Sequence, residues 1–423
     1  MFRSLRYRNA RLFFGGMVVS NIGTWLQFTA LLFVVRRLSD RGIALGVLMA
    51  CQFLPMLLLG LYAGGVADRI DKRRVVIFTQ SAMGVQALVL GVLELTDSLN
   101  LPLIYALSGV LGLLNAFDNP ARRGLATELA DRDDLTNVMA LNTSVMTGSR
   151  VFGPALAALL VAWVGTGWCF VLNGLSFLAL LWSLRAIDES KLFRNPPPPK
   201  SATPIRDGLA AVWADPIVRN TTVLFAIVST FAFNYSVSFP LLITDNLLES
   251  DSKLGLVLSV TSVGSVSGAL LVARLSDVRQ LWFIVSVLVM SVTMAALSLT
   301  HSLWVLLLLS IPFGAGGAAF VATSNAIMAG RTSPEMRGRV LALGAVLFLG
   351  STPIGGPVTG WVGDAFSATW SMLYGALISL GATTVVVAMQ LIARNREPGR
   401  ECVHPTVGTT EVQSPTAAAN TPR

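Results

Sequence analysis

Long apolar stretches separated by short polar segments run along most of the chain. Each stretch is roughly twenty residues long and apolar at nearly every position, which favours membrane-crossing helices over the alternating strands of a membrane barrel. Twelve such spans are predicted, six in each half of the chain: 12–35, 44–66, 75–95, 101–120, 138–163 and 167–186, then 218–243, 254–275, 281–300, 303–327, 338–361 and 369–393. We therefore expect an all-α membrane protein with twelve transmembrane helices.

The composition supports lipid as the solvent of this chain. Its 423 residues are 53% hydrophobic and 13% charged, whereas soluble domains carry about 25% charged residues. Inside a bilayer every backbone polar group must be satisfied by the chain itself, and a helix does this within a single span.

Two polar segments divide the chain. The segment 187–216 contains four consecutive prolines, Pro196–Pro199, and is predicted to be a cytoplasmic linker with a short amphipathic helix at Asp207–Ala214. The segment 394–423 is rich in Thr, Pro and Ala, and is predicted to be a disordered cytoplasmic tail. These boundaries predict two membrane bundles, 1–186 and 217–393.

The two halves resemble each other in sequence. Val138–Leu141 aligns with Val340–Leu343 at the same offset that places Gly153 on Gly355. A duplicated membrane protein of this kind is expected to form two six-helix bundles around a pseudo-twofold axis along the membrane normal.

Basic residues are unevenly distributed among the loops. Of the 31 Lys and Arg residues, one lies inside a span, Arg150, and only four lie in the predicted outer loops: Arg36, Arg37, Arg41 and Lys253. Basic residues favour the cytoplasmic side, so we expect a multi-pass protein of the cell (inner) membrane with both termini in the cytoplasm. The net charge of +8 is then explained by the orientation of the chain in the membrane, and acidic lipid headgroups are its natural counterpart. We therefore expect membrane lipids rather than nucleic acid as partners.

A charged loop follows the second span. It resembles the loop between the second and third helices of the major facilitator superfamily, whose pattern is close to G-x-x-x-D-R-x-G-R-R. The matching residues are Gly64, Asp68, Arg69, Lys72 and Arg73. Asp71 stands where the pattern has its second glycine, and we expect it to adopt the left-handed conformation there.

Further segments narrow the resemblance to the branch that contains macrolide-efflux and enterobactin-exporter-like proteins. They are 117–123, 135–142, 150–154, 337–340 and 355–357. The resemblance implies two pseudo-symmetric six-helix bundles and transport directed outward. Gly153-Pro154 also resembles the antiporter motif of the fifth helix, although Ala157-Ala158 replace its final glycines.

The resemblance implies that the charged loop latches the outward-facing state. The residues proposed for this conformational switch are Gly64, Asp68, Arg69, Arg73, Asp118 and Arg122. Asp118 and Arg122 lie at the inner end of the fourth predicted span, where they could join Asp68 in a charge relay or simply form a solvated helix end. The loop itself could alternatively be a plain positive anchor.

Arg150 is the most unusual residue of the chain, because it lies inside the fifth predicted span. An intramembrane charge usually faces a cavity or a partner, and Asp118 is the nearest acidic candidate. If the helix begins later than predicted, Arg150 could instead snorkel to the interface.

Two further groups of residues are predicted to act within the spans. Small residues and prolines that allow close packing and bending are Gly148, Gly153, Pro154, Gly355, Gly356 and Pro357. Candidates for lining a substrate cavity are Asn21, Trp25, Gln27, Asn234 and Tyr235. Each polar residue of the second group could equally make a hydrogen bond between helices.

The sequence shows no nucleophile–base constellation, no metal-ligand spacing and no Walker A motif, so we expect neither an enzyme nor a cofactor. The resulting prediction is a monomeric secondary active transporter that exports small amphipathic compounds, drug-like or siderophore-like, coupled to protons. The alternatives are a solute importer of the same fold and a membrane sensor or scaffold that does not transport.

Overall fold

The computed structural model describes residues 3–67, 70–131, 134–193, 204–247, 252–275 and 278–396. Within these ranges, 12 helices are long and apolar enough to cross a membrane. The first six are α1 (Arg8–Leu38), α2 (Gly42–Ala67), α3 (Lys72–Leu95), α4 (Leu101–Thr127), α5 (Leu135–Val164) and α6 (Thr166–Ala186). The seventh span consists of α8 (Pro216–Phe231), α9 (Tyr235–Leu241) and a π turn, η4 (Leu242–Asn246). The last five are α10 (Ser252–Ala273), α11 (Gln280–Ser298), α12 (Leu303–Gly330), α13 (Pro334–Ala365) and α14 (Ala368–Arg396). Each predicted span coincides with one of these to within four residues at either end, except the fourth, whose helix continues past the predicted end at Pro120 to Thr127.

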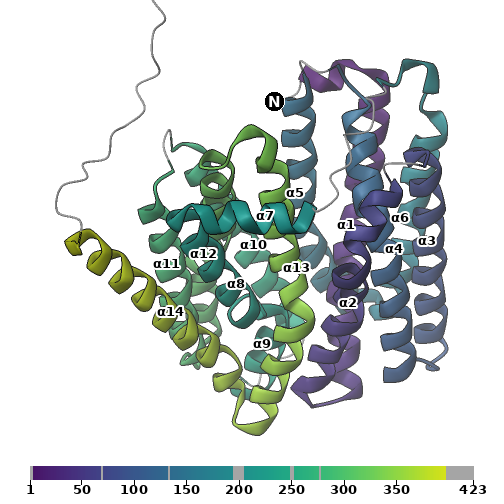
Figure 1. Ribbon diagram of the computed structural model, residues 1–423. Coiled ribbons are helices and arrows are strands. Elements are labelled where there is room, and N and C mark those ends of the chain that lie inside the picture. Colours follow the sequence, from purple (N-terminus) through teal and green to yellow (C-terminus); the bar gives the residue numbers. More distant parts are fainter. Residues whose placement is uncertain are drawn as a thin grey trace, which may run out of the picture.

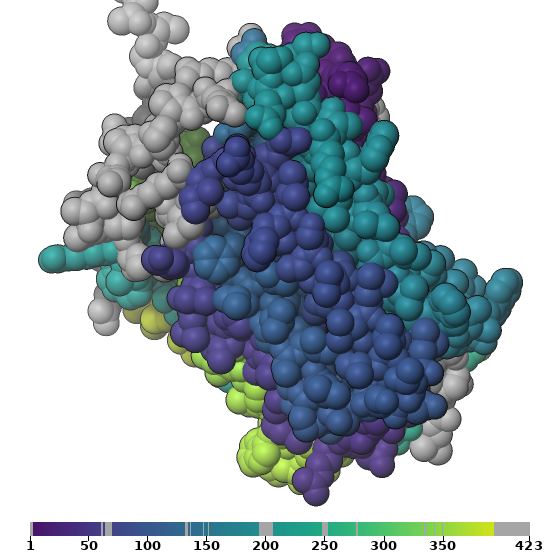
Figure 2. Space-filling view, turned by 90° about the vertical axis from the view of Figure 1, so that its right-hand side faces the viewer, coloured from purple at the N-terminus to yellow at the C-terminus, as the bar shows by residue number. Residues whose placement is uncertain are grey.

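The spans form two bundles that lie side by side (Figure 1). In the first bundle, α1 packs against α5 and α6, while α3 packs against α4 and α6. Figure 2 shows the face of the first bundle that is turned away from the second. Large apolar side chains of this bundle, such as Phe78 and Trp182, are exposed and suit contact with lipid. The second bundle contains α8 to α14. Because each bundle has an even number of spans, the start of α1 and the end of α14 lie on the same side of the membrane region, which we call the termini side.

The seventh span is interrupted near its middle, whereas the sequence predicted one continuous helix over 218–243. Helix α8 ends at Phe231 and α9 begins at Tyr235. The Asn234 amide donates to the backbone oxygen of Thr230 (2.7 Å), and the Asn234 backbone oxygen accepts from Val237 N–H (2.9 Å). These two bonds satisfy backbone oxygens near the interruption, where the regular hydrogen bonds of the helix are lost. A broken helix can therefore be accommodated inside a membrane.

The linker contains a helix, α7 (Pro204–Ala214), that begins slightly earlier than predicted. It lies across the second bundle (Figure 1). Asp207 pairs with Arg339 of α13 (2.9 Å), and Val212 is fully buried among Val218, Met328 and Val340. The consecutive prolines and the predicted tail after Arg396 lie outside the described residues.

Candidate functional site

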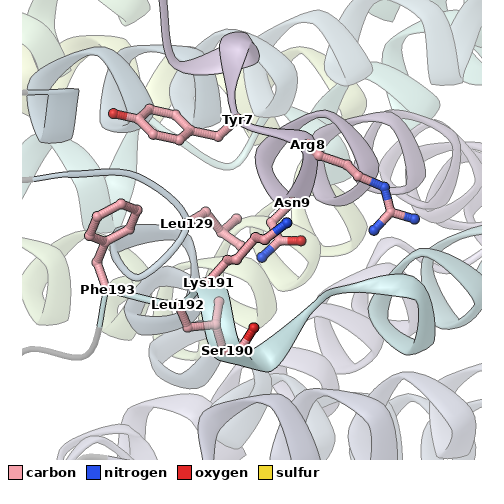
Figure 3. Close-up of a pocket in the computed structure, with 8 residues that line it drawn as sticks. All are labelled: Tyr7, Arg8, Asn9, Leu129, Ser190, Lys191, Leu192 and Phe193. Atoms are coloured by element: carbon pink, nitrogen blue, oxygen red, sulfur yellow. The ribbon is translucent and has the colours of Figure 1, made fainter.

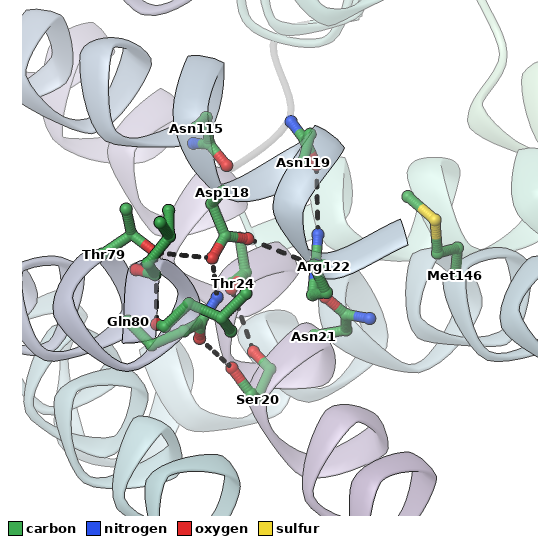
Figure 4. Close-up of polar contacts among 12 residues, drawn as sticks. Ser20, Asn21, Thr24, Thr79, Gln80, Asn115, Asp118, Asn119, Arg122 and Met146 are labelled. Carbon is green, nitrogen blue, oxygen red and sulfur yellow. Dashed lines mark hydrogen bonds and ion pairs between the residues drawn. The ribbon is translucent and has the colours of Figure 1, made fainter. Parts of the chain in front are cut away.

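A buried ion pair lies within α4, between Asp118 and Arg122 (Figure 4). The Asp118 carboxylate is 1% exposed, and its Oδ1 accepts from Thr79 Oγ1 (2.8 Å) and Gln80 Nε2 (2.9 Å), both on α3. Its Oδ2 has no well-aligned hydrogen bond but lies 3.2 Å from Arg122 Nε. A charge buried this deeply requires such partners, because desolvation penalises it strongly.

Arg122 connects this pair to α1. Its Nη1 donates to Asn21 Oδ1 (3.0 Å), and its Nη2 donates to Asn119 Oδ1 (3.1 Å). Asn21 is 8% exposed, and its Nδ2 has no hydrogen-bond partner among the described residues.

The position of this pair corrects the expectation that Asp118 and Arg122 form a helix end. The predicted fourth span stopped at Pro120, but α4 continues through this proline to Thr127. The extra turns place the pair inside the first bundle, where α1 and α3 cover it, so it is not a solvated helix end. Asp68, the partner in the alternative charge relay, lies outside the described residues.

At the surface of the termini side, other charges pair with one another. Lys72 at the start of α3 forms an ion pair with Glu128, just after α4. Arg73 pairs with Glu189 of the short helix η3 (Glu189–Lys191), and its Nε donates to the oxygen of Leu184 (2.7 Å) near the end of α6. Arg73 therefore ties α3 to α6 and the linker, and Glu128 is a partner that sequence reasoning missed.

The predicted switch loop is only partly within the described residues. Gly64 lies in the last turn of α2, while Asp68 and Arg69 lie outside the described ranges. Asp71 is not left-handed as expected. Its φ is −58°, and it caps α3 by accepting from Arg74 N–H (3.2 Å).

Arg150 lies near the middle of α5, and its guanidinium carbon is 4.9 Å from the ring centroid of Trp25 on α1. The side chain is exposed, and it makes no ion pair within the described part of the chain. Asp118, the acidic partner considered from sequence, is instead bound to Thr79, Gln80 and Arg122. A cation over an indole ring is a favourable but weaker arrangement than an ion pair.

The other predicted cavity residues lie in different surroundings. Gln27 donates to Gln86 Oε1 (3.2 Å) and accepts from Asn173 Nδ2 (2.8 Å), so it joins α1 to α3 and α6 inside the first bundle. Asn234 and Tyr235 lie at the interruption of the seventh span.

An aromatic cluster fills the second bundle. Phe320 stacks on Phe225 with ring centroids 4.9 Å apart and on Phe283 at 5.6 Å. Phe233, at the interruption, packs edge-on against Tyr235 (5.5 Å) and Phe348 (4.9 Å). Offset and edge-on pairs of this kind add to the burial of apolar area.

The two bundles meet through α2 on α13 and through α5 on α10. Between α2 and α13 the contact is a seam of four glycines, Gly42, Gly46, Gly356 and Gly360. A methyl group at Gly46 would lie 2.6 Å from the oxygen of Gly356, so the backbones touch directly.

The predicted packing residues divide among several contacts. Gly356 and Pro357 belong to the seam, while Gly355 packs on Thr230 of α8 within the second bundle. Gly153 lies against Trp25 of α1, and the Pro154 oxygen contacts Gly255 of α10. At Gly148 a methyl group would meet nothing within 4 Å, so this glycine makes no close helix contact.

Polar bonds reinforce this interface at the end remote from the termini. The Asp364 carboxylate at the end of α13 accepts from the first amides of α2, Gly42 N–H (2.5 Å) and Ile43 N–H (2.9 Å). Buried Arg36 donates to Thr244 Oγ1 (2.6 Å) and Asp245 Oδ1 (2.8 Å) of η4. Together with the seam, these contacts between the bundles run from that end to about the middle of the spans.

Comparison with known proteins identifies the family. The model of the family described as "transmembrane secretion effector" matches residues 2–409. The chain belongs to this family of the major facilitator superfamily.

Several curated relatives are named as efflux or transport proteins. The multidrug efflux pump Tap of Mycolicibacterium fortuitum is 26% identical over 87% of this chain and 93% of that protein. Macrolide efflux protein A of Streptococcus pyogenes is 22% identical over 88% and 95%. The staphyloferrin A transporter of Staphylococcus aureus is 22% identical over 62% of this chain and 66% of its own length.

Solved structures show the same fold. A bacterial homologue of the human lysosomal transporter Spinster, in an inward-facing and unoccupied conformation, has a TM-score of 0.65 at 14% identity, covering 90% of this chain and 95% of that one. The nucleoside transporter NupG has a TM-score of 0.70 at 11% identity, covering 90% and 99%. The family match and the shared fold together identify the protein as a multi-pass membrane transporter of small molecules with the major facilitator fold, and not an enzyme.

One cavity of this transporter has a volume of about 310 Å³, and the residues that line it are drawn in Figure 3. It opens on the termini side between the start of α1 and the segment after α6, and Tyr7, Leu129 and Phe193 line it. Beside it, hydrogen bonds from Ser190 lower the pKa of Asp188 below its ordinary value. The first bundle and the adjoining linker segment form all of its walls, so this cavity does not lie between the two bundles.

Proposed function

We propose that this transporter exports small amphipathic compounds in exchange for protons, by alternating access between its two bundles. The observation that carries the proposal is the buried Asp118–Arg122 pair. It supplies a titratable carboxylate deep in the first bundle, which the sequence did not place there.

Protonation of Asp118 would change the bonds of this network. A neutral carboxyl attracts Arg122 far less than a carboxylate does, and it needs an acceptor for its own proton. Arg122 would then be free to shift relative to Asn21, which lies on the neighbouring α1. Protonation of Asp118 on α4 would thereby be linked to the position of α1. Coupling of proton movement to a change of conformation requires such a link.

The direction of opening follows from charge and contact together. The distribution of Lys and Arg supports a cytoplasmic termini side. The seam, the Asp364 bonds and the Arg36 bonds then close the extracellular half of the molecule. We infer that the structure is the state open to the cytoplasm, from which an exporter loads. The loop with Asp68 and Arg69 is proposed to latch the opposite state.

Export is supported by the relatives, two of which are named efflux proteins. The test uses everted membrane vesicles that are acidified inside, supplied with a labelled macrolide, ethidium or a carboxylate siderophore. We expect pH-driven accumulation of at least one compound by the wild type and none by Asp118→Asn at equal abundance. The control is Asp97→Asn, which removes an exposed carboxylate in the connection between α3 and α4. The φ of Asp97 is 51°, and asparagine also tolerates this left-handed conformation.

Unimpaired pH-driven accumulation by Asp118→Asn would rule out Asp118 as the proton site. A wild type that accumulates none of the compounds would contradict export, and proton-driven loss of preloaded compound from the vesicles would indicate an importer.

A further inference from the structure

We propose that Arg150 and the adjoining face of α1 bind an anionic group of the transported compound, so that the cargo is an amphipathic anion. This deepens the transport function proposed above and rests on it. It uses a charge for which that function has no role, because Arg150 takes no part in the Asp118 network.

Arg150 lies where the two bundles meet. Its backbone oxygen accepts from Ser262 Oγ of α10 (2.9 Å), so this turn of α5 borders the second bundle. Its guanidinium lies over Trp25, on α1. The exposed charge is near the middle of its span, where contact with lipid would be costly, so we infer that it faces the space between the bundles.

The face of α1 beside Arg150 offers hydrogen-bond donors. Asn21 and Trp25 are one helical turn apart and therefore lie on the same face. Asn21 Nδ2 is a buried donor without a partner among the described residues, and the oxygen of the same amide accepts from Arg122. The two hydrogen bonds and the ion pair of Arg122 engage three of its five N–H groups, which leaves further donors.

The buried carboxylates in the described part of the first bundle already have partners. Asp118 is held by Thr79, Gln80 and Arg122, and Glu94 is held by Arg37 (2.8 Å) and Thr166. No buried carboxylate of this part of the chain is consequently left to balance the positive charge of Arg150, and the groups beside it on α1 are hydrogen-bond donors. A carboxylate fits such a surface, because a guanidinium can bind it with two parallel hydrogen bonds.

The second bundle supplies the apolar counterpart. The interruption of the seventh span, at a similar depth in the molecule, carries the half-buried rings of Phe233 and Tyr235. Interrupted helices near the middle of the membrane commonly form substrate sites in transporters. An aromatic body with an acidic head matches the two walls.

The test compares three fluorescent probes with one aromatic body and different charges: dansylglycine (anionic), dansylamide (neutral) and dansylcadaverine (cationic). Binding is measured by fluorescence in nanodiscs of uncharged lipid. We expect the wild type to bind dansylglycine at least about tenfold more tightly than dansylcadaverine, as a charge-assisted hydrogen bond shielded from water is strong. Arg150→Gln should abolish this preference, and Arg150→Lys should retain part of it.

Arg11→Gln is the matched control, because it removes an exposed charge near the start of α1 and should leave the preference unchanged. The proposal is overturned if the wild type fails to bind dansylglycine, binds the cation equally well, or keeps its preference in Arg150→Gln. Binding of dansylglycine through Arg150 without any pH-driven transport would contradict the proposed function and leave the anion site intact. Proton-driven transport without anion preference would contradict the anion site and leave the proposed function intact.

Discussion

The two bundles share one architecture but differ in what fills them. The first contains a buried ion pair, Asp118–Arg122, and an amide ladder in which Gln27 joins α3 and α6. The second contains stacked rings centred on Phe320. Hydrogen bonds require particular partners at particular distances, whereas rings tolerate small displacements, so the first interior is the more sensitive to a change of charge.

This difference suggests a division of labour. A proton can act on the first bundle, because its interior holds a titratable group with bound partners. An apolar ligand suits the second, because its interior ends in half-buried rings at the interruption. Between the bundles there is a third kind of contact, the glycine seam, which is backbone against backbone.

Loss of the charged partner should have the largest effect. Arg122→Met would leave Asp118 buried without its counter-ion, and we expect the free energy of unfolding to fall by about 3–5 kcal/mol. Titration with denaturing detergent measures this. Arg11→Met, at an exposed position, should change it by less than about 0.5 kcal/mol. Equal stability of Arg122→Met and wild type would mean that the first interior does not depend on the pair.

A side chain in the seam should separate the bundles without unfolding either one. At Gly46 a leucine would collide with Gly356 and Pro357, whereas Gly60, on the same helix, has nothing within 4 Å of a methyl group. We expect Gly46→Leu, but not Gly60→Leu, to lengthen the distance between spin labels at Leu38 and Phe366. Unchanged distances in Gly46→Leu would show that the seam does not set the conformation.

Loss of one ring should have the smallest effect. Phe320→Leu keeps an apolar side chain but removes the ring contacts with Phe225 and Phe283, so we expect a loss of about 1 kcal/mol. Thermal unfolding in detergent measures it, with Phe78→Leu as a lipid-facing control at 70% exposure. A loss as large as that of Arg122→Met would remove the contrast between the two interiors.

Most of the fold could be predicted from sequence, because hydrophobic length alone marks a membrane span. The interruption at Asn234 could not, since it depends on a bond to Thr230 that apolar length does not reveal. The seam could have been found in part: Gly42 and Gly46 are one turn apart, as are Gly356 and Gly360, but nothing in the sequence pairs one helix with the other.

The candidate site was predicted less completely. Asp118 and Arg122 were selected for their charge, yet their depth depends on where α4 ends beyond Pro120. Glu128 was missed because the boundary of α4 hid its proximity to Lys72. Arg150 was recognised from its position inside an apolar span, but its neighbour Trp25 follows from the crossing of α1 and α5, which spacing along one helix cannot give.

Asp364 has a consequence for the solvent. Its carboxylate, in the second bundle, accepts hydrogen bonds from the first amides of α2, in the first bundle. If the bundles part there, as the proposed alternating access requires, water must take over both the amides and the carboxylate, because none of these groups can remain unsatisfied. The proposed conformational equilibrium would thus also be a hydration equilibrium, and we expect osmolytes excluded from protein surfaces to favour the closed seam.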